Sequence, residues 1–353
     1  MVGNQRLRER RCLNENEILD IQDKYGLKIS KQKPFLEGMR SNTLFLETNF
    51  GKKVIKIYPN NFSYDLIKFQ TKVCNYMNSK GVPTPKIFSN TKDCLVTPYQ
   101  DAHYIIMQHL QGKPPTLDNP KIIPWTFKGL ALSLNTLSKF KPKEVYVAPE
   151  IDISLTEQLN ELKEAIRRRG EGKVDPIVES YQGRLDNICQ HVETKLNNLN
   201  VSKQLILGDY NSGSLLIKDG EISGILDFDL LHLQHKGYDF MHIFDIFFID
   251  KKSKNLPLEK RVDWVKLKDS MMFYSKFDPE IVDQIYTFPL MHQVLGLRSI
   301  LDIWGNYYSG RSDRKYFEEK KEFYLPRLEI PTKLGERIIE TLNEGYMEAS
   351  KRF

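Results

Sequence analysis

The sequence predicts an α+β fold in two lobes, a small antiparallel β-rich lobe over residues 1–110 followed by a large, mainly helical lobe over residues 111–353. Three observations favour this. The 353 residues, 40% of them hydrophobic and 28% charged, are typical of a globular chain long enough for two lobes. Strand-type runs dominate before residue 110. Helical periodicity dominates after the turn at 112–115, with one strand-rich island at 204–227.

In the first lobe, strand-type runs alternate with turn signals. A turn at 49–52 joins two runs in the manner of a hairpin, and apolar positions at helical spacing predict one helix that ends before Gly81 and Pro83. We therefore expect a small antiparallel sheet with one helix packed on it. The predicted strands are 35–38, 43–48, 53–58, 94–97 and 104–107, and the predicted helix is 63–80.

A hinge is expected at 108–112, and the second lobe then has helical spacing over 125–140, 154–169, 178–199 and from 237 onward. Its island contains the runs 204–207, 214–217 and 222–227. Asp219-Gly220 between the last two runs is a tight-turn signal, which predicts a hairpin inserted among the helices.

Composition excludes several classes of function. The net charge of +6 is not gathered into a dense basic stripe, so we expect no nucleic-acid partner. No apolar run reaches the ~18–20 residues that span a bilayer, so we expect no membrane partner. The four cysteines form no CxxC pair, which disfavours zinc and a disulfide framework and favours a reduced, cytoplasmic setting.

Three acids surround the predicted hairpin. Asp209 follows a strand and lies in a loop, Asp227 ends the second hairpin strand, and Asp229 follows it. Because the hairpin folds the chain back, both Asp209 and Asp227 can emerge at one edge. Phosphoryl transfer needs one carboxylate to orient or deprotonate a hydroxyl and another to hold Mg²⁺ against phosphates. The alternative is that Asp209 is only a turn residue and that Asp227 only caps the end of a strand.

Lys56 lies in a strand on the face opposite to Ile55 and Ile57. On an inner face its charge requires an anionic partner, such as nucleotide phosphates. On a solvent face it requires none, and that alternative stays open here. The loop 37–42 between the first two strands, which includes Ser41 and Asn42, offers amides and small polar side chains that can cover phosphates, although it has one glycine and does not match GxGxxG.

Several motifs together resemble the aminoglycoside phosphotransferase and choline kinase superfamily, including its type II homoserine kinase-like members. The stretch 205–217, LILGDYNSGSLLI, resembles the family's HGDxxxxN catalytic loop. The stretch 225–229, ILDFD, resembles its metal motif, and Tyr238-Asp239 resembles the pair that follows. Gly81-Val82-Pro83-Thr84-Pro85 and the strand 104–114 resemble its first-lobe turn and hinge. The match spans roughly residues 25–245.

The resemblance implies a bilobal protein-kinase-like fold and a kinase that uses ATP, or another NTP, with Mg²⁺ to phosphorylate a hydroxyl of a small molecule. In this assignment Asp209 is the catalytic carboxylate, and Asp227 and Ser214 are metal ligands. The nucleotide would contact Lys56, Ser41, Asn42, Gln70 and the main chain from Gln108 to Leu110. Asn211, Asp229 and Arg298 are assigned to the substrate side.

Three positions depart from the family's pattern. Leu207 replaces the usual His, Ser214 replaces the Asn that ligates a second metal, and Gln70 replaces the helix acid that pairs with the strand lysine. Asp65 lies one to two turns earlier. A glutamine would hydrogen-bond Lys56 without neutralising it. The catalytic loop is thus degenerate, which keeps open the alternative of a nucleotide-binding pseudokinase or scaffold with little turnover.

The second lobe offers few signals about the acceptor. Arg298 on an apolar helical run can bind an anionic substrate group or pair with Asp302 four residues on. A protein kinase is disfavoured, since no Gly-rich loop, HRD or DFG-APE arrangement is present. We expect a nucleotide and a small molecule as partners, and a monomer or homodimer.

Overall fold

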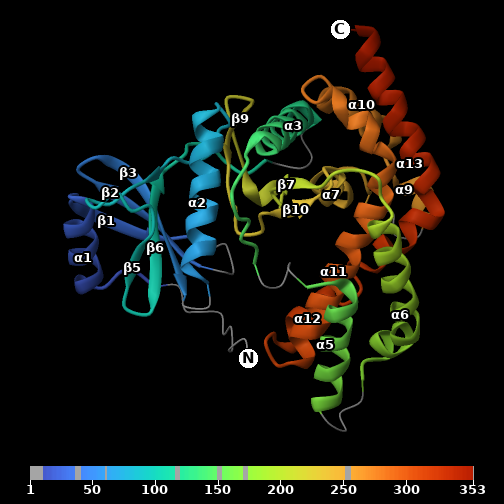
Figure 1. Ribbon diagram of the computed structural model, residues 1–353, viewed down its shortest axis with the longest axis horizontal. Coiled ribbons are helices and arrows are strands. Elements are labelled where there is room, and N and C mark those ends of the chain that lie inside the picture. The colour runs from blue at the N-terminus through green and yellow to red at the C-terminus, as the bar shows by residue number, and fades with distance from the viewer. Residues whose placement is uncertain are drawn as a thin grey trace.

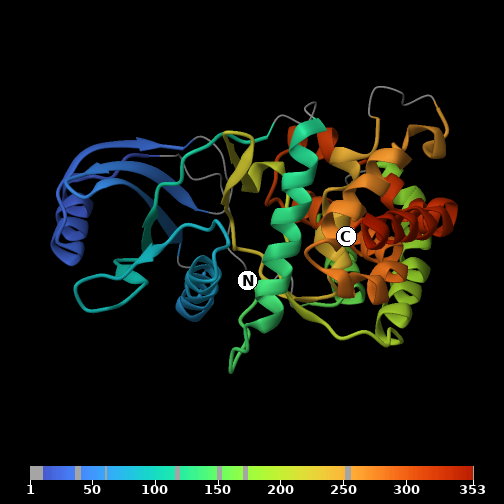
Figure 2. The same ribbon diagram turned by 90° about the horizontal axis from the view of Figure 1, so that it is seen from above.

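The structure is a computed structural model that describes residues 11–35, 41–59, 62–115, 120–148, 153–169, 174–250 and 256–352. An antiparallel sheet lies at one end and a largely helical part at the other (Figures 1 and 2). This arrangement confirms the predicted α+β fold. The predicted lobe boundary at residue 110 stays a prediction.

The N-terminal sheet has six strands, paired in the order β1-β2-β3-β6-β4, with β5 also pairing with β6. The hairpin of β2 and β3 turns at Asn49 and Phe50, as predicted. The elements are α1 (Glu15–Tyr25), β1 (Ile29–Pro34), β2 (Asn42–Thr48), β3 (Gly51–Pro59), α2 (Tyr64–Ser79), β4 (Ile87–Phe88), β5 (Thr97–Tyr99) and β6 (Ala102–Gln108).

Two helices pack on this sheet, so the expectation of one helix is wrong. α1 covers the face that carries Leu44, Leu46 and Ile55, at the end farthest from the helical part (Figure 1). It begins with a capping box between Asn14 and Glu17. α2 covers the other face and lies between the sheet and the rest of the chain in both views.

The predicted strand at 35–38 lies outside the described residues except for Phe35, and the strand before it, β1, was not predicted. β1 is Ile29–Pro34, and residues 36–40 lie outside the described residues. The sequence ISKQKP has no apolar alternation because β1 is an edge strand that pairs only with β2 among the described strands, so its side chains are mostly exposed or half-buried.

The C-terminal part contains the predicted helices and the inserted hairpin of β8 and β9. It also contains a strand that was not predicted, β10, which pairs with β7. The elements are η1 (Pro120–Ile122), α3 (Ile123–Lys139), α5 (Leu155–Arg168), α6 (Pro176–Asn197), β7 (Gln204–Ile206), η2 (Ser212–Ser214), β8 (Leu215–Lys218), β9 (Glu221–Ile225), β10 (His232–Gln234), α7 (Gly237–His242), α8 (Phe244–Phe247), α9 (Leu258–Arg261), α10 (Trp264–Ser275), η3 (Pro279–Thr287), α11 (Phe288–Tyr308), α12 (Arg314–Lys320) and α13 (Leu325–Arg352).

The β8-β9 hairpin lies between α2 and α3 and therefore joins the two parts of the molecule (Figure 1). Lys113 exchanges two main-chain hydrogen bonds with Ile217 of β8, at 3.0 and 2.8 Å, and Ile225 N donates to Pro83 O at 2.8 Å. The hairpin is thus tied both to the hinge and to the segment after α2. Among the helices that the structure describes, none is long and apolar enough to cross a membrane.

Candidate active site

Lys56 is the residue through which the N-terminal sheet enters the site. Ile55 and Ile57 face α1, so the pleat of β3 turns Lys56 towards α2 and the helical part. Its Nζ donates to both carboxylate oxygens of Asp229 at 2.8 Å and lies 3.6 Å from Oδ1 of Asp227. Burial alone lowers the pKa of Lys56, but the nearby negative charges, chiefly that of Asp229, outweigh it and hold the pKa well above its ordinary value. The solvent-facing alternative is excluded.

The partners of Asp229 correct two of the sequence assignments. Tyr58 donates its hydroxyl to Asp229 Oδ1 at 3.3 Å, and Gln70 of α2 donates its Nε2 to the Asp229 carbonyl at 3.1 Å. Within the described residues, Gln70 Oε1 is buried and has no hydrogen-bond partner, so the expected bond between Gln70 and Lys56 is not formed there. The Asp229 carboxylate takes that place because it neutralises the ammonium, which an amide cannot do. We therefore reassign Asp229 from the substrate side to counter-ion of Lys56.

Asp227 follows β9 in a left-handed backbone conformation, with φ of 63°. This conformation is uncommon for a residue with a side chain, and such strain is often found at functional sites. Asp227 Oδ1 accepts a hydrogen bond from the Asp229 amide at 3.3 Å, and 43% of its side chain is exposed. The two acids after β9 thus differ in role, since Asp229 is buried against Lys56 while Asp227 reaches solvent.

The loop that carries Asp209 is held by a buried acid, Asp239 of α7. Its two carboxylate oxygens accept the amides of Leu207 and Gly208, both at 2.8 Å. Burial raises the pKa of Asp239 to about 7, the two amides oppose the rise and the charge of Asp209 adds to it. Leu207, found where the family has His, is itself buried, and its amide provides half of this anchor.

Gly208 is required by the close approach of the loop to the segment before β10. Its φ is 79°, and a Cβ atom there would lie 2.1 Å from the Leu230 carbonyl oxygen and 2.9 Å from His232 Nδ1. The His232 ring also lies edge-on to the Tyr238 ring, with centroids 5.1 Å apart. The glycine of the Gly-Asp pair therefore adopts a backbone conformation that only glycine permits, and Asp209 follows it directly.

Two neighbours in the loop orient Asp209. Asn211 Nδ2 donates to Asp209 Oδ1 at 2.7 Å, and Ser214 Oγ donates to the Asp209 carbonyl at 3.0 Å. Gly213 N donates back to Asn211 Oδ1 at 2.7 Å, which fixes the asparagine side chain. His242 Nε2 of α7 lies 3.5 Å from Asp209 Oδ1. Asn211 and Ser214 thus serve to shape the loop; their assignments to substrate and metal stay predictions.

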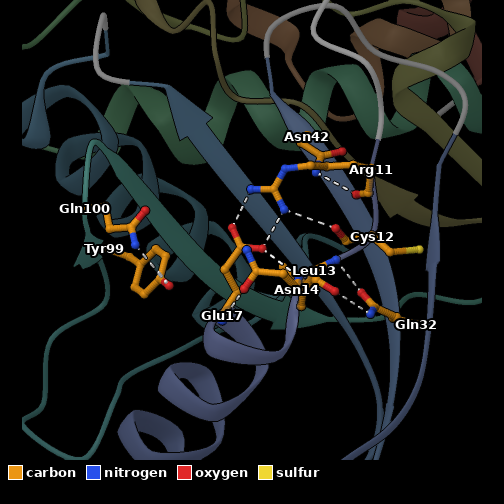
Figure 3. Close-up of polar contacts among 9 residues, drawn as sticks. All are labelled: Arg11, Cys12, Leu13, Asn14, Glu17, Gln32, Asn42, Tyr99 and Gln100. Atoms are coloured by element: carbon orange, nitrogen blue, oxygen red, sulfur yellow. Dashed lines mark hydrogen bonds and ion pairs between the residues drawn. The ribbon is translucent and has the colours of Figure 1, made fainter.

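The side chain of Asn42 lies on the wrong face of the sheet to cover a nucleotide, which corrects that assignment. Its Nδ2 donates to the Arg11 carbonyl at 3.0 Å, beside the ion pair of Arg11 with Glu17 at the start of α1 (Figure 3). In the β2-β3 register Asn42 is opposite Ile57, while Thr43 is opposite Lys56. Because successive side chains alternate, Thr43 lies on the face of Lys56.

Ser41 shares that face with Thr43, since side chains two positions apart in a strand lie on the same face, and their hydroxyl oxygens lie 3.4 Å apart. The rest of the predicted phosphate loop, residues 37–40, lies outside the described residues.

The hinge brings β6 and the hairpin into contact. Gln108 N donates to the Lys86 carbonyl at 2.8 Å, so this amide is already used. The main chain of Leu110 makes no hydrogen bond to the part of the chain that the structure describes. A Cβ atom at Gly224 would lie 3.0 Å from Leu110 Cδ1, so a glycine allows the hinge to lie against β9. Of the predicted adenine contacts, the main-chain groups of Leu110 are therefore available for a hydrogen bond, whereas the amide of Gln108 is not.

Arg298 lies on α11. Its Nε and Nη1 atoms are buried and have no hydrogen-bond partner in the described structure. Asp302 Oδ1 accepts a hydrogen bond from Asn306 Nδ2 at 2.9 Å, and the assignment of Arg298 to the substrate side stays a prediction.

The donor set fits a metal held jointly with phosphates. Within the described ranges, no group of three or more His, Cys, Asp or Glu side chains could hold a metal ion. Mg²⁺ commonly uses one or two carboxylates, substrate phosphates and water rather than an all-protein cage. The partly exposed carboxylate of Asp227 suits that mode, since it offers hard oxygen atoms towards solvent.

Some site residues were missed by sequence reasoning. Asp239 appears in the sequence analysis only as part of a Tyr-Asp pair without a role. The feature that could have identified it is its position shortly after the strand-rich island. Strand alternation could have placed Tyr58 and Thr43 on the same face of the sheet as Lys56. His242 had no sequence signal, because its proximity to Asp209 depends on how α7 packs under the loop.

Comparisons with known proteins identify the family and the fold. Residues 31–259 match the family model described as phosphotransferase enzyme family. The fold is similar to amicoumacin kinase hAmiN in complex with AMP-PNP, Ca²⁺ and Ami, with 15% identity, a TM-score of 0.67, and coverage of 91% of this chain and 94% of that one.

It is also similar to choline kinase from Cryptosporidium parvum Iowa II, with 14% identity, a TM-score of 0.60, and coverage of 90% and 93%. For Plasmodium vivax ethanolamine kinase the identity is 14%, the TM-score 0.58, and the coverage 85% and 82%. At these identities the likeness shows the fold alone. None of the curated proteins matches the chain significantly. Because the family model covers more than half of the sequence, this chain belongs to the phosphotransferase enzyme family of kinase-like fold.

Proposed function

We propose that this chain is an ATP- and Mg²⁺-dependent kinase that phosphorylates a hydroxyl of a small molecule such as an antibiotic, an amino alcohol or a biosynthetic intermediate. One observation carries the proposal. The β3 lysine, Lys56, lies 2.8 Å from Asp229 and 3.6 Å from Asp227, so a cation of the sheet meets the acids that follow β9. A cation that can bind phosphate and a carboxylate that can bind a metal are thus close together between the two parts of the molecule, which supports the proposal.

In this proposal the triphosphate lies against Lys56, and the hinge main chain at Leu110 binds the base. Asp229 keeps Lys56 charged and limits where its ammonium can reach, because the pair is buried. Asp227 would hold Mg²⁺, and Ser214 is the candidate second ligand. When bound, the metal would neutralise the charge that develops on the phosphates. ATP is retained as the donor, with another NTP as the alternative, and a cytoplasmic setting remains part of the proposal.

Asp209 faces the acceptor. Asn211 and the Asp239 anchor hold the loop, so the Asp209 carboxylate is pre-oriented to accept a hydrogen bond from the attacking hydroxyl. A bond forms between the acceptor oxygen and the γ-phosphorus, and the bond from that phosphorus to the β,γ-bridging oxygen breaks. The hydroxyl proton passes to the Asp209 carboxylate, and ADP leaves with the electron pair.

A nucleotide-binding pseudokinase is the second candidate, and the Lys56 pair is the observation that favours it. The ammonium already has a bidentate carboxylate, so phosphates must compete with Asp229 for it. In the described chain, neither Gln70 nor an acid of α2 forms a hydrogen bond or ion pair with Lys56 that could replace Asp229. A protein of this kind would bind Mg·ATP and turn it over slowly or not at all.

The test measures Mg·ATP consumption over a panel of hydroxylated antibiotics, amino alcohols, sugars and hydroxy acids, together with the melting shift produced by Mg·ATP. We expect acceptor-dependent turnover that falls about 100-fold or more in Asp209→Asn and in Asp227→Asn. Asp219→Asn is the matched control, since this exposed acid lies at the far turn of the same hairpin. A Mg·ATP melting shift without turnover for any acceptor would instead support the pseudokinase.

A further inference from the structure

His242, the last residue of α7, approaches the carboxylate that the proposed function makes catalytic. Its Nε2 atom lies 3.5 Å from Asp209 Oδ1, and Asn211 Nδ2 donates to the same oxygen at 2.7 Å. The side chains of His242 and Asp209 are 21% and 30% exposed, so both reach solvent at this point. A hydroxyl that binds to Asp209 would therefore meet the carboxylate beside the imidazole ring.

The catalytic loop and α7 are tied together, which fixes where the imidazole lies. The carboxylate of Asp239 accepts the amides of Leu207 and Gly208, both at 2.8 Å. Asp239 and His242 are three residues apart, and side chains at that spacing share a face of a helix. The face of α7 that anchors the loop is therefore also the face that presents the imidazole to Asp209.

Aromatic packing around α7 holds the helix in place. Phe240, in the middle of α7, is fully buried. Its ring centroid lies 4.9 Å from that of Phe127 on α3, 5.6 Å from that of Tyr274 on α10 and 5.0 Å from that of Phe288 on α11. Such close packing resists displacement of a helix. The imidazole at the end of α7 is therefore held near the loop by the core as well as by the loop itself.

The imidazole can act as a hydrogen-bond donor to the catalytic carboxylate. The separation of 3.5 Å is long for a hydrogen bond, and bonds of this kind commonly tighten when the substrates bind. A neutral imidazole donates from one ring nitrogen and accepts at the other. With its proton on Nε2, His242 donates to Asp209 Oδ1. Together with Asn211 it would then fix the plane of the carboxylate.

We infer that His242 is a positioning residue for the phosphoryl transfer, which donates its Nε2 proton in a hydrogen bond to Asp209 Oδ1 and holds the carboxylate towards the acceptor hydroxyl. This inference rests on the proposed kinase function and changes no step of it, since the hydroxyl proton still passes to Asp209. The alternative is a purely structural histidine, whose ring only lies favourably at the carboxyl end of α7. The two roles differ in what a conservative replacement does.

The first test compares two replacements of His242 in the full chain. Glutamine keeps an N–H donor near the position of Nε2, whereas leucine has none. We expect His242→Leu to lower kcat about 10- to 100-fold, the loss of a charge-assisted hydrogen bond, with KM for Mg·ATP little changed, and His242→Gln to recover most of that loss. The assay follows Mg·ATP turnover with each acceptor of the panel and with water as the acceptor. His191→Leu is the matched control, because this histidine is exposed on α6.

A double variant separates the positioning role from a structural one. His242→Leu added to Asp209→Asn should lower turnover no further, since the group that His242 positions is already altered. The inference is overturned if His242→Leu loses no activity, if His242→Leu and His242→Gln lose equally, or if the losses of the double variant multiply. Turnover that is the same in the wild type and in Asp209→Asn would instead refute the proposed function.

A further measurement needs neither an acceptor nor turnover. Isotope-labelled histidine lets NMR report which ring nitrogen carries the proton in the full chain saturated with Mg·AMP-PNP at alkaline pH, and His242→Gln identifies the signals of His242. We expect the proton on Nε2 in the wild type and a mixture of both tautomers in Asp209→Ala, which has no carboxylate to accept it. A wild-type ring with its proton on Nδ1 alone overturns the inference whatever the turnover.

Discussion

Replacing Asp229 by asparagine keeps the shape of the side chain and removes the charge that holds Lys56. The two side chains are 4% and 13% exposed, so the pair is a buried one. Removing one partner of such a pair typically costs about 3–5 kcal/mol, because the other charge stays buried. Asp227 Oδ1 lies 3.6 Å from the Lys56 ammonium, so its charge offsets part of this cost. We expect Asp229→Asn to lower the free energy of unfolding by about 3 kcal/mol.

The assay is urea unfolding at neutral pH, with a double-mutant cycle that combines Asp229→Asn with Lys56→Met. The double variant should lose less than the sum of the two single losses, since it has no unpaired ammonium. Asp186→Asn is the matched control, because its pair with Lys163 is 43% and 40% exposed and should contribute under about 1 kcal/mol.

The sign of the pH dependence follows from the raised pKa of Lys56. The stability that the Lys56–Asp229 pair contributes is fully present below pH 10.5, the ordinary pKa of lysine. It is lost only as pH rises through the higher pKa of Lys56 in the folded state. A loss for Asp229→Asn no larger than that for Asp186→Asn, or two single losses that simply add, would show that Asp229 and Lys56 do not stabilise each other as a buried pair.

The other predictions concern the catalytic loop. Gly208→Ala should destabilise the protein and abolish turnover, because its Cβ atom would lie 2.1 Å from a backbone oxygen; Gly220→Ala, at φ of 85° with open space, should cost only about 1–2 kcal/mol in unfolding experiments. For Asp239 the folded pKa of about 7 exceeds the ordinary value of 3.8, so the folded chain holds a proton that the unfolded chain releases between these values. Its contribution to the free energy of unfolding therefore falls as pH rises across that window, by up to about 1.4 kcal/mol per pH unit, and Asp239→Asn should remove this slope from denaturation measured at pH 4–7. An unchanged slope would mean that Asp239 stays ionised in the folded state.

Local patterns predicted most elements because helices and hairpins depend on neighbours in sequence. The predicted helix 63–80 corresponds to α2, and the predicted hairpin around Asp219-Gly220 corresponds to β8 and β9. The edge strand β1 and the helix α1 were both missed, because mostly polar residues form them. A signal for α1 is nevertheless visible in the sequence, the capping box of Asn14 and Glu17.

The family, the kinase-like fold and the acids that end the strands can be predicted from the sequence, because strand periodicity and the Gly-Asp and Leu-Asp-Phe-Asp motifs are local. Which side chains meet depends on the packing of the folded chain. Asp229 rather than Gln70 neutralises Lys56 from 173 positions away, and strand register turns Asn42 away from the site. Asp239 fixes the loop of Asp209 through a helix packed beneath it. Such contacts depend on how elements distant in sequence pack, which no local pattern encodes.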